Sequence, residues 1–287
     1  MTEAGLRLDF RDMTEADLAD GLRLSRASGW NQTLEDWRLL LASGPGLFRV
    51  GVENGRVVAS GGAVRYGDAL AWICMILVEP ESRGRGLGTR VFDEVLGRCQ
   101  TEVRAGRLRS VGLDATPAGR GIYQHRGFVE GPALVRMRSE SVTQADSRAR
   151  TRRVEGSEMD RLLARDLKVF GADRRVVLRW ALESAPELAW TTTDGAYCFG
   201  RHGDHSEHVG PVVADDREDA FALIRACLSL PRRRPLILDA RVEPAWLATL
   251  ATLGFQEQRR FTRMYLGDSR PAARPALEPA VLGPEFG

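Results

Sequence analysis

The sequence predicts an α/β fold, an α+β mixed sheet with covering helices, that occurs twice in one chain. Three observations support this prediction: the order of the expected strands and helices, a glycine-rich turn between a buried strand and a helix, and short motifs that recur late in the chain. The chain has 287 residues, which is long enough for two domains of ordinary size.

Strand and helix signals alternate along the first half of the chain. Residues 6–10 alternate apolar and polar side chains, as a half-buried strand does. Two helices are expected next, because Thr14 with Asp17 and Thr33 with Asp36 have the spacing of N-terminal capping boxes. The remaining elements are expected as strands at 48–52 and 56–60 around an Asn-Gly turn, strands at 69–78, 109–115 and 128–137, and helices at 87–99 and 119–125.

The glycine-rich segment comes directly after strand 69–78, whose nearly continuous apolar side chains predict a central strand. Its residues are Arg83, Gly84, Arg85, Gly86, Leu87, Gly88 and Thr89, and a helix is expected to begin near Leu87. Alternate glycines let successive backbone amides converge on one anion, and a helix N-terminus adds a positive dipole. The segment therefore predicts a pyrophosphate site with two arginines at its rim, and a glycine-rich turn that binds nothing stays open as the alternative.

This segment resembles motif A of the GNAT (Gcn5-related N-acetyltransferase) family. The family pattern, Val-x-Pro followed by Arg/Gln-x-x-Gly-x-Gly/Ala, is matched by residues 78–80 and 83–88. About 35 residues later, the sequence from Tyr123 to Phe128 resembles the Tyr-x-x-x-Gly-Phe of motif B. The resemblance covers about residues 6–138, and residues 29–37 and 113–119 look like a subgroup of bacterial two-domain GNAT proteins.

The resemblance implies a role for each matched residue. Backbone groups of Ile76, Leu77 and Val78 would pair with the pantetheine arm of acetyl-CoA, with an amide near Leu77 as a donor to the thioester oxygen. The amides from Arg83 to Thr89 would hold the pyrophosphate. Tyr123 would protonate the leaving thiolate as a general acid. Thr116 stands where many relatives have an asparagine, so it would contact the pantetheine with less reach.

A general base is not marked out by the sequence. Glu79, at the end of the cofactor strand, and Asp114, at the end of the next strand, are both candidates. A surface or turn carboxylate is the alternative for each of them. The carboxylates at 35 and 36 are assigned to helix capping instead.

The second half of the chain repeats motifs of the first half. The sequences at 113–115, 127–128 and 135–137 recur at 238–240, 254–255 and 262–264, always 125 to 127 residues later, which indicates a duplicated fold. The second copy lacks the glycine-rich loop and the tyrosine, so it is expected to bind no CoA. The expected domains are a catalytic domain at 1–140, a linker at 141–152, a degenerate GNAT-like domain at 153–268 and a flexible C-terminal tail at 269–287.

Composition narrows the class of protein. The net charge of +2 argues against nucleic acid as a partner, and no apolar stretch is long enough for a membrane span. The four cysteines form no CxxC pair, and the histidines at 202, 205 and 208 are expected to bind no metal. A cytoplasmic enzyme is expected that moves acetyl from the cosubstrate acetyl-CoA to a primary amine of a small molecule, as a monomer or homodimer. A non-catalytic acyl-CoA sensor or scaffold and a protein or peptide N-acetyltransferase are the alternatives.

Overall fold

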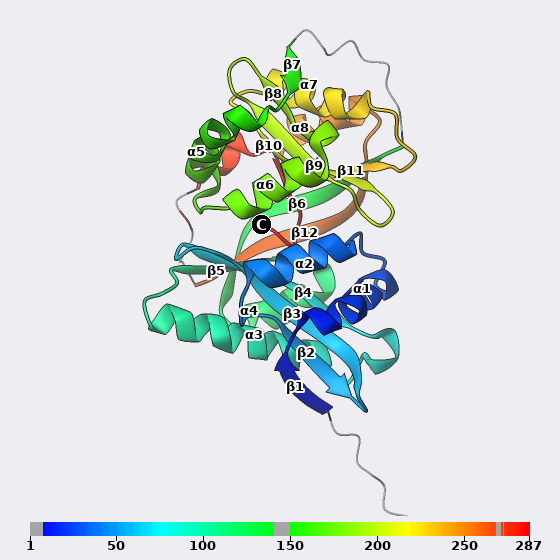
Figure 1. The fold of residues 1–287 in the computed structure, drawn as a ribbon, viewed down its shortest axis with the longest axis vertical. Coiled ribbons are helices and arrows are strands. Elements are labelled where there is room, and N and C mark those ends of the chain that lie inside the picture. The colour runs from blue at the N-terminus through cyan, green and yellow to red at the C-terminus, as the bar shows by residue number, and fades with distance from the viewer. Residues whose placement is uncertain (1–7, 141–149, 268–270, 272) are drawn as a thin grey trace, which may run out of the picture. The chain divides into compact units, whose positions relative to one another are not determined.

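The computed structural model describes residues 8–140, 150–267, 271 and 273–287 (Figure 1). The chain divides into two compact units, Met1–Val111 and Gly112–Gly287. The sequence placed the domain boundary in a linker at 141–152, most of which lies outside the described residues. Among the described residues, no helix is long and apolar enough to cross a membrane.

From residue 8 onward, the first unit is an antiparallel sheet with three α-helices. Its elements are β1 (Leu8–Asp12), α1 (Leu18–Ala27), α2 (Leu34–Ser43), β2 (Arg49–Glu53), β3 (Arg56–Tyr66), β4 (Leu70–Val78) and α3 (Leu87–Arg104). The strands pair in the order β1-β2-β3-β4. Asn54 and Gly55 both have positive φ in the β2–β3 turn, which confirms the predicted hairpin. Both predicted capping boxes are present, at Thr14 and at Thr33.

The second unit begins within strand β5 (Ser110–Ala115) and contains one mixed sheet. Its other elements are α4 (Pro117–Gln124), β6 (Phe128–Ser139), β7 (Thr151–Arg153), α5 (Met159–Phe170), α6 (Arg175–Ser184), β8 (Trp190–Thr192), β9 (Tyr197–Arg201), β10 (Glu207–Val213), α7 (Arg217–Leu228), β11 (Leu236–Arg241), α8 (Pro244–Thr252), β12 (Gln256–Leu266) and β13 (Ala280–Val281). The strand order is β5-β12-β6-β11-β13-β10-β9-β8-β7.

Apolar side chains cover both faces of this mixed sheet. Along β9, Tyr197 and Phe199 pack into a core shared with α5 and α6. Cys198, between them, belongs to the core shared with α7 and α8. Alternation along a strand sends successive side chains to opposite faces, so the sheet is buried on both sides.

The two copies of the fold exchange their last strands. We call β1–β6 the first repeat and β7–β12 the second repeat. The last strand of the first repeat, β6, pairs with β11, and the last strand of the second repeat, β12, pairs with β5. Strands β6 and β12 also pair with each other, green beside orange in Figure 1. This exchange places the compact-unit boundary inside the first repeat, well before the linker that the sequence predicted.

The expected flexible tail at 269–287 is wrong for its described part. Residues 280 and 281 form strand β13 between β10 and β11. Val281, Leu282 and Phe286 are fully buried. Four prolines and little periodicity concealed this strand, because only two of its residues pair and its burial depends on distant partners.

Candidate functional site

Strand β4 contains a bulge three residues before its end. Its pairing with β3 shifts between Cys74 and Leu77, and Met75 has a φ of 56°. The Ser60 hydroxyl donates to the Met75 carbonyl at 3.1 Å and holds this unusual backbone in place. A Cβ at Gly61, opposite the bulge, would lie 2.6 Å from Ile76 Cδ1, so the Ile76 side chain would have to move. The bulge redirects the last residues of the strand, which are those that the sequence assigned to pantetheine.

The glycine-rich loop has the backbone geometry expected of an anion nest. Gly84 and Gly86 both have a φ of 75°, in the left-handed region, and Gly86 is the N-cap of the 18-residue helix α3. The first amides of a helix have no acceptor within the helix, so those after Gly86 are available to an anion. Leu87 and Val78 belong to one apolar cluster, which fixes the start of the helix against the end of β4.

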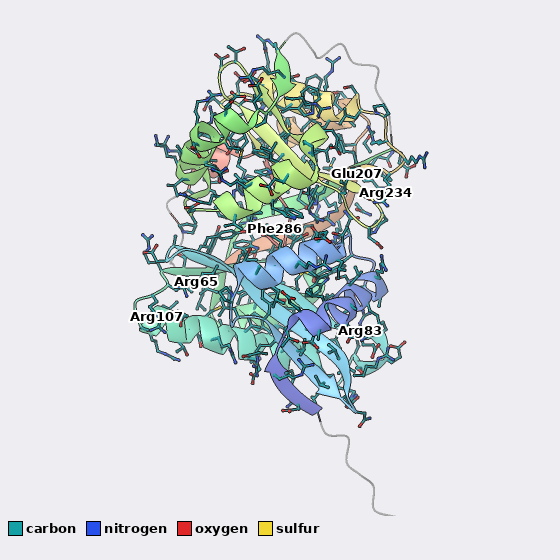
Figure 2. All side chains as sticks on the ribbon, viewed as in Figure 1. Arg65, Arg83, Arg107, Glu207, Arg234 and Phe286 are labelled. Atoms are coloured by element: carbon teal, nitrogen blue, oxygen red, sulfur yellow. The ribbon has the colours of Figure 1, made fainter. Side chains whose placement is uncertain are left out.

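The two arginines of the loop are already engaged with the protein. Arg83 donates to the Val78 carbonyl at 3.2 Å and to the Ser28 hydroxyl at 3.3 Å. Arg85 forms a two-point contact with Glu53, at 2.9 and 2.6 Å, and this guanidinium lowers the pKa of that carboxyl. Both side chains therefore anchor the loop, on β4 and β2. Figure 2 labels Arg83 near the loop.

Glu79 comes directly after β4 and is buried. Its Oε1 atom accepts from the guanidinium groups of Arg23 and Arg56. Arg23 also donates to the Val57 carbonyl at 2.6 Å, so the group is tied to the beginning of β3. Both arginines bond to Oε1, so the other carboxylate oxygen, Oε2, is the atom that could take a proton from an amine.

Tyr123 lies on α4, in the second unit. Its ring packs over Gly119, one turn earlier, where a Cβ would lie 2.9 Å from the Tyr123 ring. The ring also contacts Phe128 at a centroid distance of 6.3 Å. Burial raises the pKa of the Tyr123 hydroxyl to about 12, so it is protonated at neutral pH, as a general acid must be. The sequence identified Tyr123 but not Gly119, which only the ring contact reveals.

Thr116 is the N-cap residue of the same helix. Its carbonyl accepts from the Gly119 and Arg120 amides, and its side chain forms no capping hydrogen bond. Backbone hydrogen bonds therefore form the cap of this helix, and the Thr116 hydroxyl does not take part in it. The glycine-rich loop and Glu79 belong to the first unit, whereas Thr116 and Tyr123 belong to the second.

Both carboxylate oxygens of Asp114 are bonded to one arginine, so this residue is poorly suited to act as a base. Arg263 faces it directly across the β5–β12 ladder and donates to both carboxylate oxygens, at 3.0 and 2.8 Å. Its carboxylate has no exposed surface. Burial alone would lower the pKa of Arg263, and the facing carboxylate overcomes this and raises it. We therefore remove Asp114 from the candidate bases.

A second ion pair has the same arrangement, but here the arginine comes from the first repeat and the carboxylate from the second. Arg136, in β6, donates to both oxygens of Asp239, in β11, at 2.8 and 2.7 Å. The two residues also face each other across their ladder. The motifs that revealed the duplication in the sequence are therefore the ones that join the exchanged strands. We call these two ion pairs the seam.

The second repeat keeps the bulge and loses the loop. Pairing of β10 with β9 shifts between Val209 and Val212, again just before the strand ends. Only residues 214–216 then separate β10 from α7, whereas residues 79–86 separate β4 from α3. Asp216 caps α7 by accepting from the Asp219 amide at 2.9 Å, so a carboxylate of the chain occupies the place of an anion.

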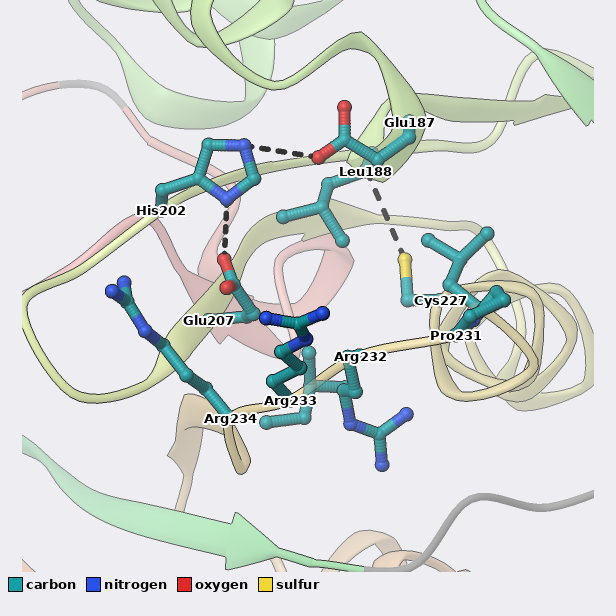
Figure 3. A pocket seen from close by; sticks show the side chains of 11 residues that line it. Glu187, Leu188, His202, Glu207, Cys227, Pro231, Arg232, Arg233 and Arg234 are labelled. Carbon is teal, nitrogen blue, oxygen red and sulfur yellow. Dashed lines mark hydrogen bonds and ion pairs between the residues drawn. The ribbon is translucent and has the colours of Figure 1, made fainter.

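A pocket of about 490 Å³ opens near the other end of β10 (Figure 3). On one side His202 lies between two carboxylates, 3.0 Å from Glu187 Oε1 and 2.6 Å from Glu207 Oε2. Arg232 and Arg234 line the other side and donate to the backbone carbonyls of residues 228 and 203. These polar groups are largely satisfied by the chain itself, and the glycine-rich loop is not part of this pocket.

Two family models match the chain, one over each repeat. The model described as Acetyltransferase (GNAT) family matches residues 11–128, and the model described as Acetyltransferase (GNAT) domain matches residues 162–277. A holothin acyltransferase of Pseudoalteromonas sp. (strain SANK 73390) is 25% identical over 249 residues, which is 84% of this chain and 81% of that protein. A mycothiol acetyltransferase of Acidothermus cellulolyticus is 30% identical over 139 residues, which is 45% of this chain and 40% of that protein.

Two solved structures share the fold over 90% or more of the chain. A crystal structure from Pyrococcus horikoshii has a TM-score of 0.79 at 20% identity and covers 100% of this chain and 99% of its own. A tandem GNAT protein from the clavulanic acid biosynthesis pathway has a TM-score of 0.60 at 15% identity, with 90% and 98% covered. At these identities the likeness concerns the fold, which includes the tandem arrangement.

Proposed function

Because the chain belongs to the GNAT family and carries two GNAT domains, we propose that its first repeat transfers acetyl from acetyl-CoA to a primary amine of a small molecule. One observation carries this proposal: the bulged strand β4 leads into a loop with two left-handed glycines at the N-terminus of a long helix. That geometry suits the pyrophosphate of CoA, which is anionic. The second repeat lacks it.

The reaction assigns a task to each group. The loop amides hold the pyrophosphate, and the end of β4 offers backbone groups to the pantetheine arm, with the Thr116 hydroxyl as a further contact. The amine nitrogen attacks the thioester carbonyl, and an amide near Leu77 stabilises the oxyanion. The carbon–sulfur bond then breaks, and Tyr123 gives its proton to the thiolate. The proton lost by the amine goes to Oε2 of Glu79 or to water.

The choice of a small acceptor draws on the relatives. The relative that matches most of the chain is named for acylating holothin, and the other is named for acetylating mycothiol. Neither name refers to a protein substrate. We therefore favour a small-molecule amine over a protein N-terminus as the acceptor.

The test is release of free CoA from acetyl-CoA with a panel of small amines. Tyr123→Phe should lower kcat by about 10² to 10⁴-fold and leave the Kd for acetyl-CoA unchanged, because only the proton donor is lost. Tyr66→Phe, in β3, is the matched control and should keep full turnover. Acetyl-CoA binding without turnover for any amine would favour the sensor or scaffold, and an unchanged kcat in Tyr123→Phe would remove the tyrosine from the mechanism.

A further inference from the structure

Strands β10 and β11 diverge at the bulge of β10, and the chain itself fills the gap. The two strands pair in parallel only at residues 207–208 with 236–237. Beyond the bulge, Val212 pairs instead with Ala280 of β13, and the other edge of β13 pairs with β11 at Asp239 and Ala240. A pair of splayed strands with an added strand between them is therefore complete in the second repeat. We call residues 275–287 the inserted segment.

Backbone contacts hold the inserted segment along its length. The Ala214 amide donates to the Leu277 carbonyl at 3.0 Å, and the Arg241 amide donates to the Pro279 carbonyl at 2.9 Å. Gly210, in the bulge, is needed for the approach, because a Cβ there would lie 2.0 Å from the Val281 carbonyl oxygen. The bulge of β10 is thus shaped to admit a peptide backbone.

Two buried carboxylates of the inserted segment neutralise buried arginines. Glu278 accepts from Arg174 at 2.8 Å and from Arg241 at 2.6 Å. Glu285 accepts from Arg201, which is 1% exposed. Burial would raise the pKa of Glu278, and the two arginines overcome this and lower it. Without the segment, Arg201 would lose Glu285 and Arg241 would lose Glu278, whereas Arg174 would keep its ion pair with Asp166.

Apolar contacts join the inserted segment to the exchanged strands. Val281 packs in one cluster with Leu134 of β6 and Phe261 of β12. Phe286, labelled in Figure 2, contacts Trp180 at a centroid distance of 6.2 Å. The segment is therefore bound by the same three means that bind a tight peptide ligand: strand addition, paired charges and apolar burial.

We propose that the gap between β10 and β11 is a peptide site whose resident ligand is residues 275–287 of this chain. In the second repeat this gap, called the slot below, corresponds to the proposed cofactor site of the first repeat. The segment lies between splayed strands, where the first repeat is proposed to take pantetheine. The slot selects a peptide because its loop is too short for a phosphate nest and Asp216 caps the adjoining helix. The second repeat is then a structural partner with an integral ligand, and it holds no acyl-CoA.

The experiment cuts the segment free without removing it. A specific protease sequence is inserted after Gly267 in the full chain, and the folded protein is cleaved. The freed fragment should remain bound through gel filtration, and a labelled synthetic peptide of residues 275–287 should exchange into its place. A peptide with Glu278→Gln and Glu285→Gln should bind at least about tenfold more weakly, because each buried charged hydrogen bond contributes strongly.

The controls separate a bound ligand from a loose tail. A scrambled peptide should not exchange, and millimolar acetyl-CoA should not displace the labelled peptide. If the inserted sequence prevents folding, the double variant Glu278→Gln with Glu285→Gln in the whole chain is used instead. Its melting temperature should fall well below that of a control variant, Glu183→Gln, whose side chain is exposed on α6. A fragment that separates while the rest stays folded, displacement by acetyl-CoA, or equal melting temperatures would each overturn the proposal.

Discussion

The strands β4 and β10 occupy equivalent places in the two repeats and differ in the connection to the next helix. Both carry a bulge just before their last residues. After β4, eight residues with two left-handed glycines lead to α3, and after β10 three residues ending in Asp216 lead to α7. The bulged strand is therefore present in both repeats, whereas the glycine-rich loop that is proposed to bind the anion is present in the first repeat only.

This difference separates the residues that the fold requires from those that the chemistry requires. The seam ion pairs are present in both directions, because each repeat depends on a strand of the other. The second repeat has only three residues where the first has the glycine-rich loop, and the inserted segment fills the gap between β10 and β11. The two repeats therefore share the residues that join the exchanged strands, and the second repeat lacks those that are proposed to bind the cofactor.

The largest expected effect of a substitution concerns the seam. Arg263→Met leaves the buried carboxylate of Asp114 without its bidentate partner and should lower the free energy of unfolding by about 3–5 kcal/mol. Arg136→Met should cost less, because Asp239 keeps a second contact with His208 Nε2 at 3.1 Å. Denaturant titration of both variants measures the difference.

A matched variant checks the cause of that loss. Asp114→Asn added to Arg263→Met removes the unpaired charge and should recover part of the lost stability. If Arg263→Met and Arg136→Met are both as stable as the parent chain, the seam does not hold the exchanged strands.

A smaller effect is expected from copying the second repeat into the first. Gly86→Asp places a carboxylate at the N-cap of α3, as Asp216 does for α7, and imposes a left-handed backbone on a residue with a Cβ. The affinity for acetyl-CoA should fall by about 10 to 100-fold, which corresponds to about 1.4–2.7 kcal/mol.

Two further variants test which feature of the loop causes the loss of affinity. Gly86→Ala separates backbone strain from charge and should lose less affinity than Gly86→Asp. The reverse change, Asp216→Gly, should create no second acetyl-CoA site, since three residues are too few for the nest. Titration gives the Kd for acetyl-CoA of all three variants. If Gly86→Asp binds acetyl-CoA as tightly as the parent chain does, the comparison of the two loops is wrong.

The smallest expected effect is a pH dependence from His208, which has no counterpart beside Asp114. Burial lowers the pKa of His208, and Arg201 and Arg136 act in the same direction against Asp239. The unfolded chain therefore takes up a proton below about pH 6.5 that the folded chain resists, so stability falls as the pH drops. The loss is at most about 1 kcal/mol between about pH 6.5 and 5.5, the limit for a folded chain that takes up no proton there.

Replacing the ring tests that assignment. His208→Gln should flatten the dependence of the unfolding free energy on pH over the same interval, because no proton is taken up there. The depressed pKa of Asp239 keeps that carboxylate ionised throughout, so it adds no slope in this window. An unchanged slope in His208→Gln would assign the dependence to another group.

Local patterns predicted the parts of the molecule that depend on nearby residues. The capping boxes at Thr14 and Thr33, the Asn54-Gly55 turn and the start of α3 were all visible in short stretches of sequence. The glycine-rich loop could be predicted because its backbone needs glycine at fixed positions. Motif comparison also predicted the duplication, which the two family models confirm.

Long-range pairing was not predictable in the same way. The partner of Asp114 lies 149 residues away, and nothing in its local sequence distinguishes a catalytic carboxylate from a paired one. The burial of Glu278 depends on Arg174, 104 residues earlier, so a proline-rich stretch looked like a tail. Such contacts become visible only when the strand order is known.

The most direct test of the difference between the two repeats is isothermal titration of the purified chain with acetyl-CoA, read for the number of sites. We expect one site per chain, which Gly86→Asp weakens and Asp216→Gly leaves unchanged. Two sites per chain would show that the second repeat binds the cosubstrate despite its short loop and inserted segment. No binding at millimolar acetyl-CoA would contradict the assignment of the first repeat as an acetyltransferase.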